Sequence, residues 1–104
     1  MSQWSFLTNH AHVMLCIAHD PDSRLRDISD AVGITERAAH RIVAELVEDG
    51  YVTRERRGRR NRYHVHPERP FAHPNSSHPL LRDRTMEELL SVFLVDSEPV
   101  RQAA

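Results

Sequence analysis

The chain has 104 residues, 39% of them hydrophobic, and a formal net charge of −1 at pH 7. This length fits one small domain with a modest core. Its single cysteine excludes an internal disulfide, and its longest apolar run, residues 13–18, is too short to span a bilayer. We therefore expect a cytoplasmic protein without a signal peptide.

The first predicted helix covers residues 6–19 and ends at the DPD sequence of residues 20–22. Residues 23–25 are expected to form a short strand that joins a later sheet. The helix has a face that can pack on other helices, and this face consists of Val13, Met14, Ile17 and Ala18.

A pair of helices around Gly33 follows. Residues 25–35 read LRDISDAVGIT, which predicts a helix that ends where Gly33 adopts a positive φ. The side chain of Thr35 can cap the next helix, expected over residues 36–49 and stopped by Gly50. Ser29 is small where the two helices come closest. Two helices joined by such a tight turn form a helix-turn-helix.

The second helix of this pair is predicted to be amphipathic. Its apolar positions recur at i, i+3, i+4, i+7 and i+8, and they are Ala39, Ile42, Val43, Leu46 and Val47. The opposite face is basic at its N-terminal end, which is the end that meets base edges in helix-turn-helix proteins. Arginine can bond guanine there in bidentate fashion. The candidates for base readout are Arg37, Ala38, His40 and Arg41. The alternative is an ordinary solvated helix face.

The residues after Gly50 predict a hairpin, with strands at residues 51–57 and 62–66 and a loop at residues 58–61. Residues 54–62 hold six arginines and one glutamate, a local charge of +5 in a chain of net charge −1. This density favours contact with phosphates or a narrow minor groove over the alternative, a solvated edge protected from pairing. The candidate contacts to the DNA backbone or minor groove are Thr35, Arg54, Arg56, Arg57, Arg59, Arg60, Asn61 and Arg62.

Residues 13–66 resemble the winged-helix domain of the MarR and ArsR type of bacterial and archaeal transcriptional regulators. The resemblance is carried by LRDI at 25–28, VGIT at 32–35, RIVAELVEDGYV at 41–52 and RRGRRNRY at 56–63. It implies a second motif helix that reads the major groove, a wing that grips the backbone or minor groove, and DNA binding as a homodimer. The expected fold class is mainly α with a small β-hairpin wing (α+β): a winged helix-turn-helix over residues 1–66 with an added C-terminal helix.

Residues 67–84 change character, because they contain Pro67, Pro70, Pro74 and Pro79. Proline at this density disfavours a helix and favours an extended arm rich in proline and histidine. This arm is either a plain linker or a segment that Phe71 anchors on the domain or on a partner.

A C-terminal helix is predicted over residues 85–95, with a flexible tail at residues 96–104. Thr85 and Glu88 form a capping box at its start. Its apolar stripe is expected to form a homodimer interface, since symmetric homodimers are the commonest soluble assembly. The alternatives are that the helix folds back on the first helix of its own chain, or that residues 4–19 make the dimer. The stripe consists of Met86, Leu89, Leu90, Phe93 and Leu94.

The patterns of other function classes are weak. Cys16 with His19, and His64 with His66, are spaced to share a metal ion, yet no familiar ligand cluster is intact, so neither a metal nor a cofactor is expected. A phosphate loop, a nucleophile elbow and a marked carboxylate pair are all missing, which argues against an enzyme.

The sequence thus predicts a nucleoid-associated transcriptional repressor that binds double-stranded DNA sequence-specifically as a homodimer. An unidentified small-molecule effector is a further expected partner, and a membrane is not. The alternatives are a winged helix that serves protein interaction without reading DNA, and a metal-responsive regulator. RNA is a weaker alternative because the basic stretch lacks base-stacking aromatic residues.

Overall fold

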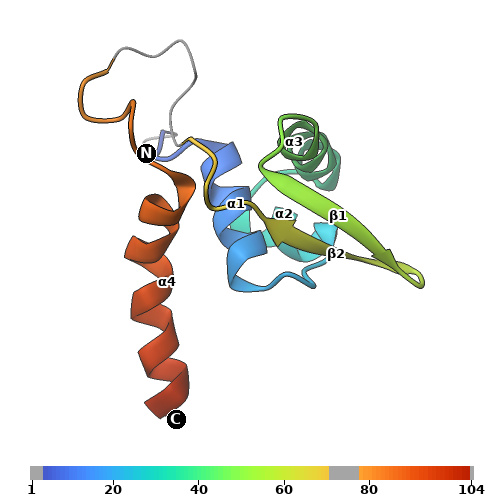
Figure 1. The fold of residues 1–104 in the computed structure, drawn as a ribbon. Coiled ribbons are helices and arrows are strands. Elements are labelled where there is room, and N and C mark those ends of the chain that lie inside the picture. The colour runs from blue at the N-terminus through green and yellow to red at the C-terminus, as the bar shows by residue number, and fades with distance from the viewer. Residues whose placement is uncertain (1–3, 71–77, 104) are drawn as a thin grey trace. The chain divides into compact units, whose positions relative to one another are not determined.

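The computed structural model describes residues 4–70 and 78–103, with side chains described as far as residue 94. The elements in chain order are α1 (Asn9–His19), α2 (Leu25–Val32), α3 (Glu36–Glu48), β1 (Val52–Arg57), β2 (Arg60–Val65) and α4 (Met86–Ala103) (Figure 1). The chain divides into two compact units, Met1–Val65 and His66–Ala104. The first unit joins three helices to a β-hairpin. The predicted winged-helix, α+β fold class is therefore confirmed.

Helix α1 begins at Asn9, three residues later than the sequence pattern predicted. The reason is the cap: the Oγ1 atom of Thr8 accepts a hydrogen bond from the backbone N–H of Ala11 at 3.2 Å. The helix ends at His19, before the predicted turn. It buries Val13, Met14 and Ile17 in the core of the first unit.

The turn between α2 and α3 has the predicted form. Gly33 has φ +86°, and its N–H donates to the carbonyl oxygen of Ser29 at 2.8 Å. Because the left-handed conformation costs residues with a Cβ atom free energy, glycine is the residue that fits. The Oγ1 atom of Thr35 then accepts from the N–H of Ala38 at 3.0 Å and caps α3. Both predictions, the glycine stop and the threonine cap, are confirmed.

The two helices of the motif meet through buried apolar side chains. Ser29 is 4% exposed, and its hydroxyl donates to the carbonyl oxygen of Arg26 at 2.8 Å, so its burial leaves no unsatisfied polar group. The buried side chains on α2 and α3 are those of Ile28, Ala39, Ile42, Val43 and Leu46. Val47, expected on the same stripe, is only partly buried.

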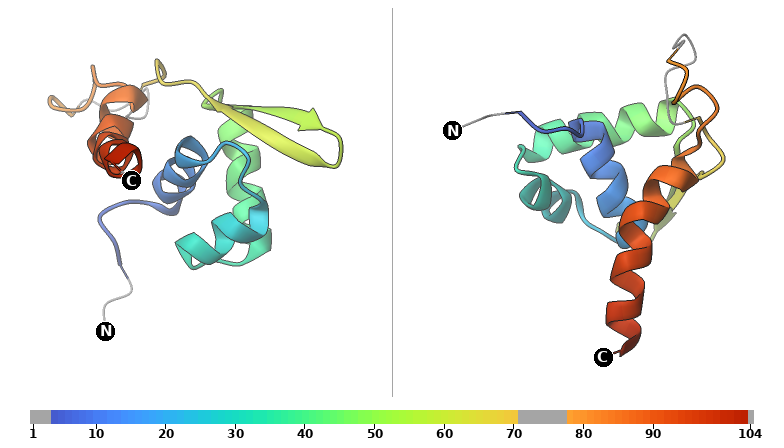
Figure 2. Two further views of the ribbon diagram at one scale, coloured as in Figure 1. Left: turned by 90° about the horizontal axis from the view of Figure 1, so that it is seen from below. Right: turned by 90° about the vertical axis from the view of Figure 1, so that its left-hand side faces the viewer.

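The hairpin pairs β1 with β2 in antiparallel register, from Val52 opposite Val65 to Arg57 opposite Arg60. Its loop is the two residues Gly58 and Arg59, shorter than the expected loop of residues 58–61, because the backbone pairing continues through Arg60. Gly58 has φ +62° and Arg59 does not have a positive φ, as in a type II′ turn, which matches the twist of paired strands. Figure 1 and the left view of Figure 2 show the hairpin beside the three helices, with its tip projecting beyond them.

The expected strand at residues 23–25 is wrong. The sheet of the described residues has two strands, and Leu25 already belongs to α2. The preceding turn contacts β2 through one backbone hydrogen bond, from the N–H of Tyr63 to the carbonyl oxygen of Pro21 at 2.9 Å. One bond does not make a strand.

In the second unit, residues 66–70 lie alongside the start of α4. Pro70 forms an antiparallel bridge with Thr85, and the carbonyl oxygens of Pro67 and Arg69 accept from the N–H groups of Glu87 and Met86, each at 2.9 Å. These bonds satisfy donors that a helix start leaves unpaired. Glu88 also accepts from the N–H of Thr85 at 3.0 Å, as one half of the predicted capping box.

Two expectations about this unit differ from the structure. Residues 79–83 form turns rather than an extended arm, with the N–H of Leu81 bonded to the carbonyl oxygen of His78 at 3.1 Å. Helix α4 continues to Ala103, where a tail was expected after Val95, because backbone hydrogen bonding can continue after the apolar stripe has ended. Phe71, the expected anchor, lies outside the described residues. None of the described helices combines the length and apolar character needed to cross a membrane.

Candidate nucleic-acid interface

The N-terminal half of α3 presents the predicted readout residues at the surface. Arg37, His40 and Arg41 are exposed, and Ala38 is half-buried beside them. In the described part of the chain, the side chains of Arg37 and His40 form no hydrogen bond or ion pair. The guanidinium of Arg41 lies 3.9 Å from a carboxylate oxygen of Glu45, at the limit of an ion pair. A ligand can therefore reach all three polar groups without breaking a strong contact.

Glu45 ties the opposite end of this surface to α1. Its Oε1 atom lies 2.7 Å from Nε2 of His10, and both side chains are about half exposed. The contact joins the exposed faces of two helices, α1 and α3. The sequence offered no sign of this pair, because the two residues are 35 positions apart.

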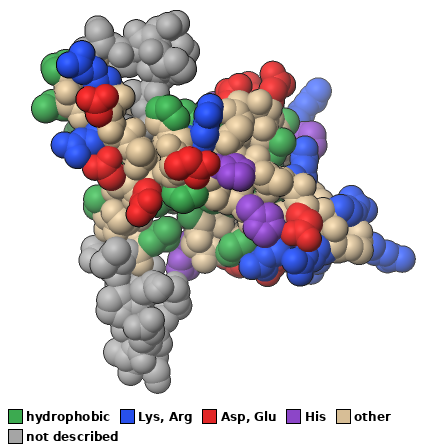
Figure 3. Space-filling model, in the orientation of Figure 1, with side chains coloured by type: hydrophobic (Ala, Val, Ile, Leu, Met, Phe, Trp, Pro, Cys, Tyr) green, Lys and Arg blue, Asp and Glu red, His purple; other side chains and the backbone are tan. Residues whose placement is uncertain are grey.

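The six arginines of the hairpin divide by their contacts. In the space-filling view, basic side chains gather over the hairpin toward its tip (Figure 3). Arg54 and Arg59 are exposed, and among the described residues neither has a side-chain partner. The Nε atom of Arg56 donates to the carbonyl oxygen of Gly58 at 2.7 Å. Asn61 is half-buried.

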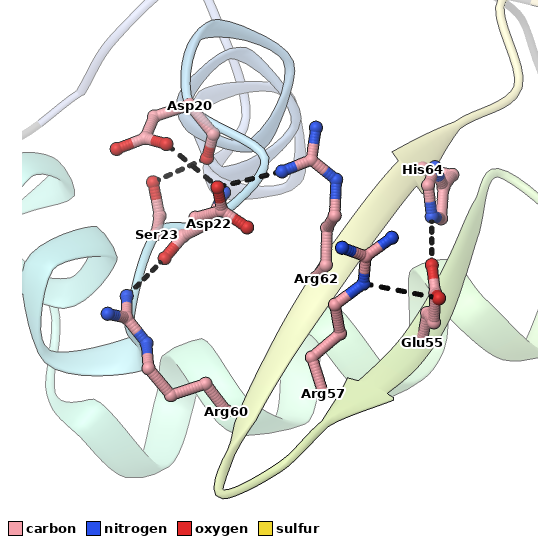
Figure 4. A network of polar contacts seen from close by, with 8 residues as sticks. All are labelled: Asp20, Asp22, Ser23, Glu55, Arg57, Arg60, Arg62 and His64. Carbon is pink, nitrogen blue, oxygen red and sulfur yellow. Dashed lines mark hydrogen bonds and ion pairs between the residues drawn. The ribbon is translucent and has the colours of Figure 1, made fainter.

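Glu55 is the acidic residue among these arginines, and it holds two basic partners on one face of the hairpin (Figure 4). Its Oε1 atom lies 2.7 Å from Nε2 of His64, and its Oε2 atom accepts from Nε of Arg57 at 3.2 Å. The hydrogen bond with His64, and then that with Arg57, lower the pKa of the Glu55 carboxyl below its usual value. Glu55 therefore stays ionised and neutralises part of the charge of the wing.

The remaining two arginines contact the turn between α1 and α2 (Figure 4). An Nη2 atom of Arg60 donates to the backbone carbonyl oxygen of Asp22 at 2.6 Å. An Nη1 atom of Arg62 donates to the Asp22 carboxylate at 2.7 Å. Sequence reasoning missed Asp22, since about 40 positions separate it from these partners and no local spacing connects them.

A cleft of about 500 Å³ opens between the start of α2, the start of α3 and the hairpin. It contains basic side chains from two separate elements, together with the carboxylates of Asp27 and Glu36. Glu36 lies 3.8 Å from Arg26, which reduces its repulsion toward an approaching anion. The basic residues that line the cleft are Arg24, Arg26, Arg59 and Arg60.

The stripe predicted on α4 is covered unevenly. Met86 and Leu90 are each 6% exposed in the single chain, while Phe93 is 44% exposed. Leu89 and Leu94 are half-buried, and Val92 is 62% exposed. Only part of the stripe is therefore open to a second molecule.

The described residues contain no group of three or more His, Cys, Asp or Glu side chains that could hold a metal ion. Cys16 is half-buried, and burial raises the pKa of its thiol.

One protein-family model matches the helix-turn-helix part of the chain. The model of the IclR helix-turn-helix domain matches residues 7–56, which include α1, α2, α3 and most of β1. The match supports a winged helix-turn-helix regulator that binds DNA, and it does not confirm the MarR or ArsR type. No curated protein matches the chain.

Proposed function

We propose that this helix-turn-helix regulator recognises a specific double-stranded DNA site as a homodimer and represses transcription there. One observation carries the proposal. The same compact unit presents an exposed basic end of α3 and a hairpin whose residues 54–62 carry a formal charge of +5. A basic helix end beside a basic wing suits base edges and phosphates together.

Base readout belongs to the exposed end of α3. Arg37 is the first candidate because its guanidinium has no competing partner among the described residues. Arg41 follows, since its ion pair with Glu45 is long and exposed. His40 and Ala38 complete the set, as a hydrogen-bonding group and a small apolar contact.

Phosphate contacts belong to the wing and to the cap of α3. Arg54 and Arg59 are available without losing an internal partner, in contrast to Arg57 and Arg62. The Thr35 hydroxyl accepts a bond as a helix cap and keeps its own hydrogen to donate to a phosphate. The remaining proposed contacts are Arg56, Arg60 and Asn61.

The dimer is proposed to form through the exposed part of the α4 stripe around Phe93, next to which Val92 is also exposed. A symmetric pair would present two recognition helices to two half-sites. A dimer bound across an operator excludes other proteins from that DNA, which is why we propose repression. We propose no metal or cofactor for this function.

Selection from a random duplex library tests the proposal. The wild-type protein should return a defined motif, and Arg37→Ala or Arg41→Ala should relax preference at particular bases at a cost of about 1–3 kcal/mol on the selected site. Glu48→Ala, at the other end of the exposed face, is the matched control and should return the wild-type motif. If both arginine variants also return it unchanged, α3 does not read the bases.

The chief alternative is a wing that binds another protein. The buried core of a protein interface is more apolar than the rest of the surface and is enriched in aromatic side chains and methionine. The large exposed hydrophobic side chains of the described residues are Trp4, Phe6, Leu80, Val92 and Phe93, and none of these is in the hairpin. The wing therefore fits a polyanion better than an apolar partner.

A further inference from the structure

The hairpin is attached to the turn between α1 and α2 at several points. The N–H of Tyr63 donates to the carbonyl oxygen of Pro21 at 2.9 Å. Arg60 bonds the backbone oxygen of Asp22, and Arg62 bonds its carboxylate, at 2.6 and 2.7 Å (Figure 4). Three residues of β2 thus converge on two residues of one turn.

The turn that receives them is itself ordered. The carboxylate of Asp20 accepts from the N–H of Asp22 at 3.1 Å. The backbone oxygen of Asp20 accepts from the N–H and from the hydroxyl of Ser23, at 3.0 and 2.7 Å. Asp22 is therefore held by its neighbours in the turn as well as by Arg62.

We propose that Asp22 is a positioning residue for DNA binding: it holds Arg62 against the turn, sets the angle of the wing, and leaves Arg54 and Arg59 to meet phosphates. The proposal rests on the proposed function, because the angle of the wing matters only if the wing contacts DNA.

Two observations favour this role over a direct DNA contact by Arg62. The Arg62 side chain is 34% exposed, against 60% for Arg57, so Arg62 is the less accessible of the two. A phosphate would also have to displace a charge-assisted hydrogen bond of 2.7 Å. A two-stranded ribbon has little rigidity of its own, so the side-chain bonds from β2 to the turn decide where its tip points.

Five variants test the proposal in DNA titrations over a range of salt concentrations. Asp22→Ala and Arg62→Gln should each weaken binding to the selected site about three- to tenfold, and the double variant should be no weaker than either single one. Arg62→Gln should leave the salt slope on random duplex unchanged, whereas Arg59→Gln should lower it by about one unit. Asp27→Ala removes the same charge from the neighbouring cleft, where Asp27 has no ion pair among the described residues, and should not weaken site binding.

A direct contact between Arg62 and phosphate predicts the opposite change in DNA affinity for Asp22→Ala. If Arg62 contacts phosphate and Asp22 competes for it, Asp22→Ala will tighten binding to every duplex while Arg62→Gln weakens it and lowers the slope. Either that pattern, or wild-type affinity in both single variants, would overturn the positioning role.

A measurement without DNA separates this inference from the proposed function. Hydrogen exchange of the Tyr63 amide should accelerate about threefold or more in Asp22→Ala and Arg62→Gln, and not in Asp27→Ala. A wild-type protein that binds no duplex would refute the proposed function, and with it any role of Asp22 in DNA binding. If the Tyr63 amide exchanges at the wild-type rate in both variants while the wild-type protein binds DNA, the positioning role of Asp22 is refuted and the proposed function stands.

Discussion

Gly33 shows how one residue sets the angle between two helices. Its φ of +86° lies in the left-handed region, and a Cβ atom built there would meet nothing within 4 Å. A substitution at Gly33 therefore changes backbone strain without a steric clash. The residue was identified from the sequence because the need for a positive φ is local.

We predict that Gly33→Ala lowers the free energy of unfolding by about 1 kcal/mol, and that Gly33→Asn lowers it less, since asparagine tolerates this conformation better. Urea denaturation of the three proteins gives the ranking. Equal stability of the alanine variant would mean that the turn relaxes to a negative φ.

We also predict that the carboxyl of Glu55 titrates below its usual pKa of 4.5, as followed by NMR, and that His64→Ala moves the pKa back toward that value. A group whose pKa is lowered on folding stabilises the folded state above its unfolded pKa, and this contribution is lost as the pH falls through the folded pKa. The hairpin should therefore loosen on acidification below about pH 4.5. A Glu55 pKa that His64→Ala leaves unmoved would show that Arg57 alone holds the carboxylate.

Residues whose role depends on neighbours in the sequence could be predicted, and residues whose role depends on distant partners could not. Thr35 and Ser29 belong to the first kind. Asp22 and Glu45 belong to the second, because their partners lie 35 to 40 positions away. An aspartate in a turn is ordinary until the fold brings an arginine to it.

At the scale of elements, the hairpin allows the clearest prediction of which basic side chains contact phosphate. The sequence does not distinguish its arginines from one another, but the structure separates those with internal partners from Arg54 and Arg59. The number of arginines in the hairpin is therefore not the number of phosphate contacts that the hairpin can make.

We predict that Arg54→Gln with Arg59→Gln reduces affinity for all duplexes and lowers the slope of log K against log salt by about two units. Arg57→Gln is the matched control, since Glu55 already occupies that guanidinium, and it should lower the slope by less. Anisotropy titration over a salt series measures both. A double variant with the wild-type slope would place the phosphate contacts elsewhere.

The boundaries of elements were predicted less well than their existence. The start of α1 shifted because Thr8 caps it, and the loop of the hairpin shortened because Arg60 and Asn61 pair with β1. The expected third strand at residues 23–25 failed for another reason, since α2 begins at Leu25, within that segment. The end of α4 was placed where the apolar stripe stops, yet backbone hydrogen bonding does not require an apolar face.

At the scale of the whole molecule, the exposure of each apolar side chain on α4 decides which substitution tests the proposed dimer. Leu90 is 6% exposed in the single chain, so a charge at this position would disturb the chain itself. Phe93, at 44% exposed, is the better probe of an interface.

We predict that Phe93→Glu converts the protein to a folded monomer with much weaker binding to its operator, because the charge would be buried in the contact. Ser91→Glu is the control, since it places the same charge two residues away, on a different side of the helix. Analytical ultracentrifugation with circular dichroism separates dissociation from unfolding. A Phe93→Glu variant that remains dimeric would point to Trp4 and Phe6, an exposed aromatic pair with ring centroids 4.9 Å apart.

The dimer also predicts the form of the DNA site. Two recognition helices related by a twofold axis should meet an inverted repeat, with half-site centres about 10 base pairs apart or a multiple of that. Footprinting of the selected site checks the spacing. Protection of a single half-site by the wild-type protein would argue for a monomer.

Because the loop has only the two residues Gly58 and Arg59, the length of the two strands sets how far the hairpin tip reaches. Adding one residue to each strand would move the tip outward by about 3.4 Å and turn the side chains between the two insertions to the opposite face. Adding two to each strand would restore the faces at twice the extension. Relatives with longer or shorter wings should therefore differ by even numbers of residues per strand. Each added pair of residues should shift the wing's contacts along the DNA backbone, while the part of β2 that contacts the turn between α1 and α2 stays in place.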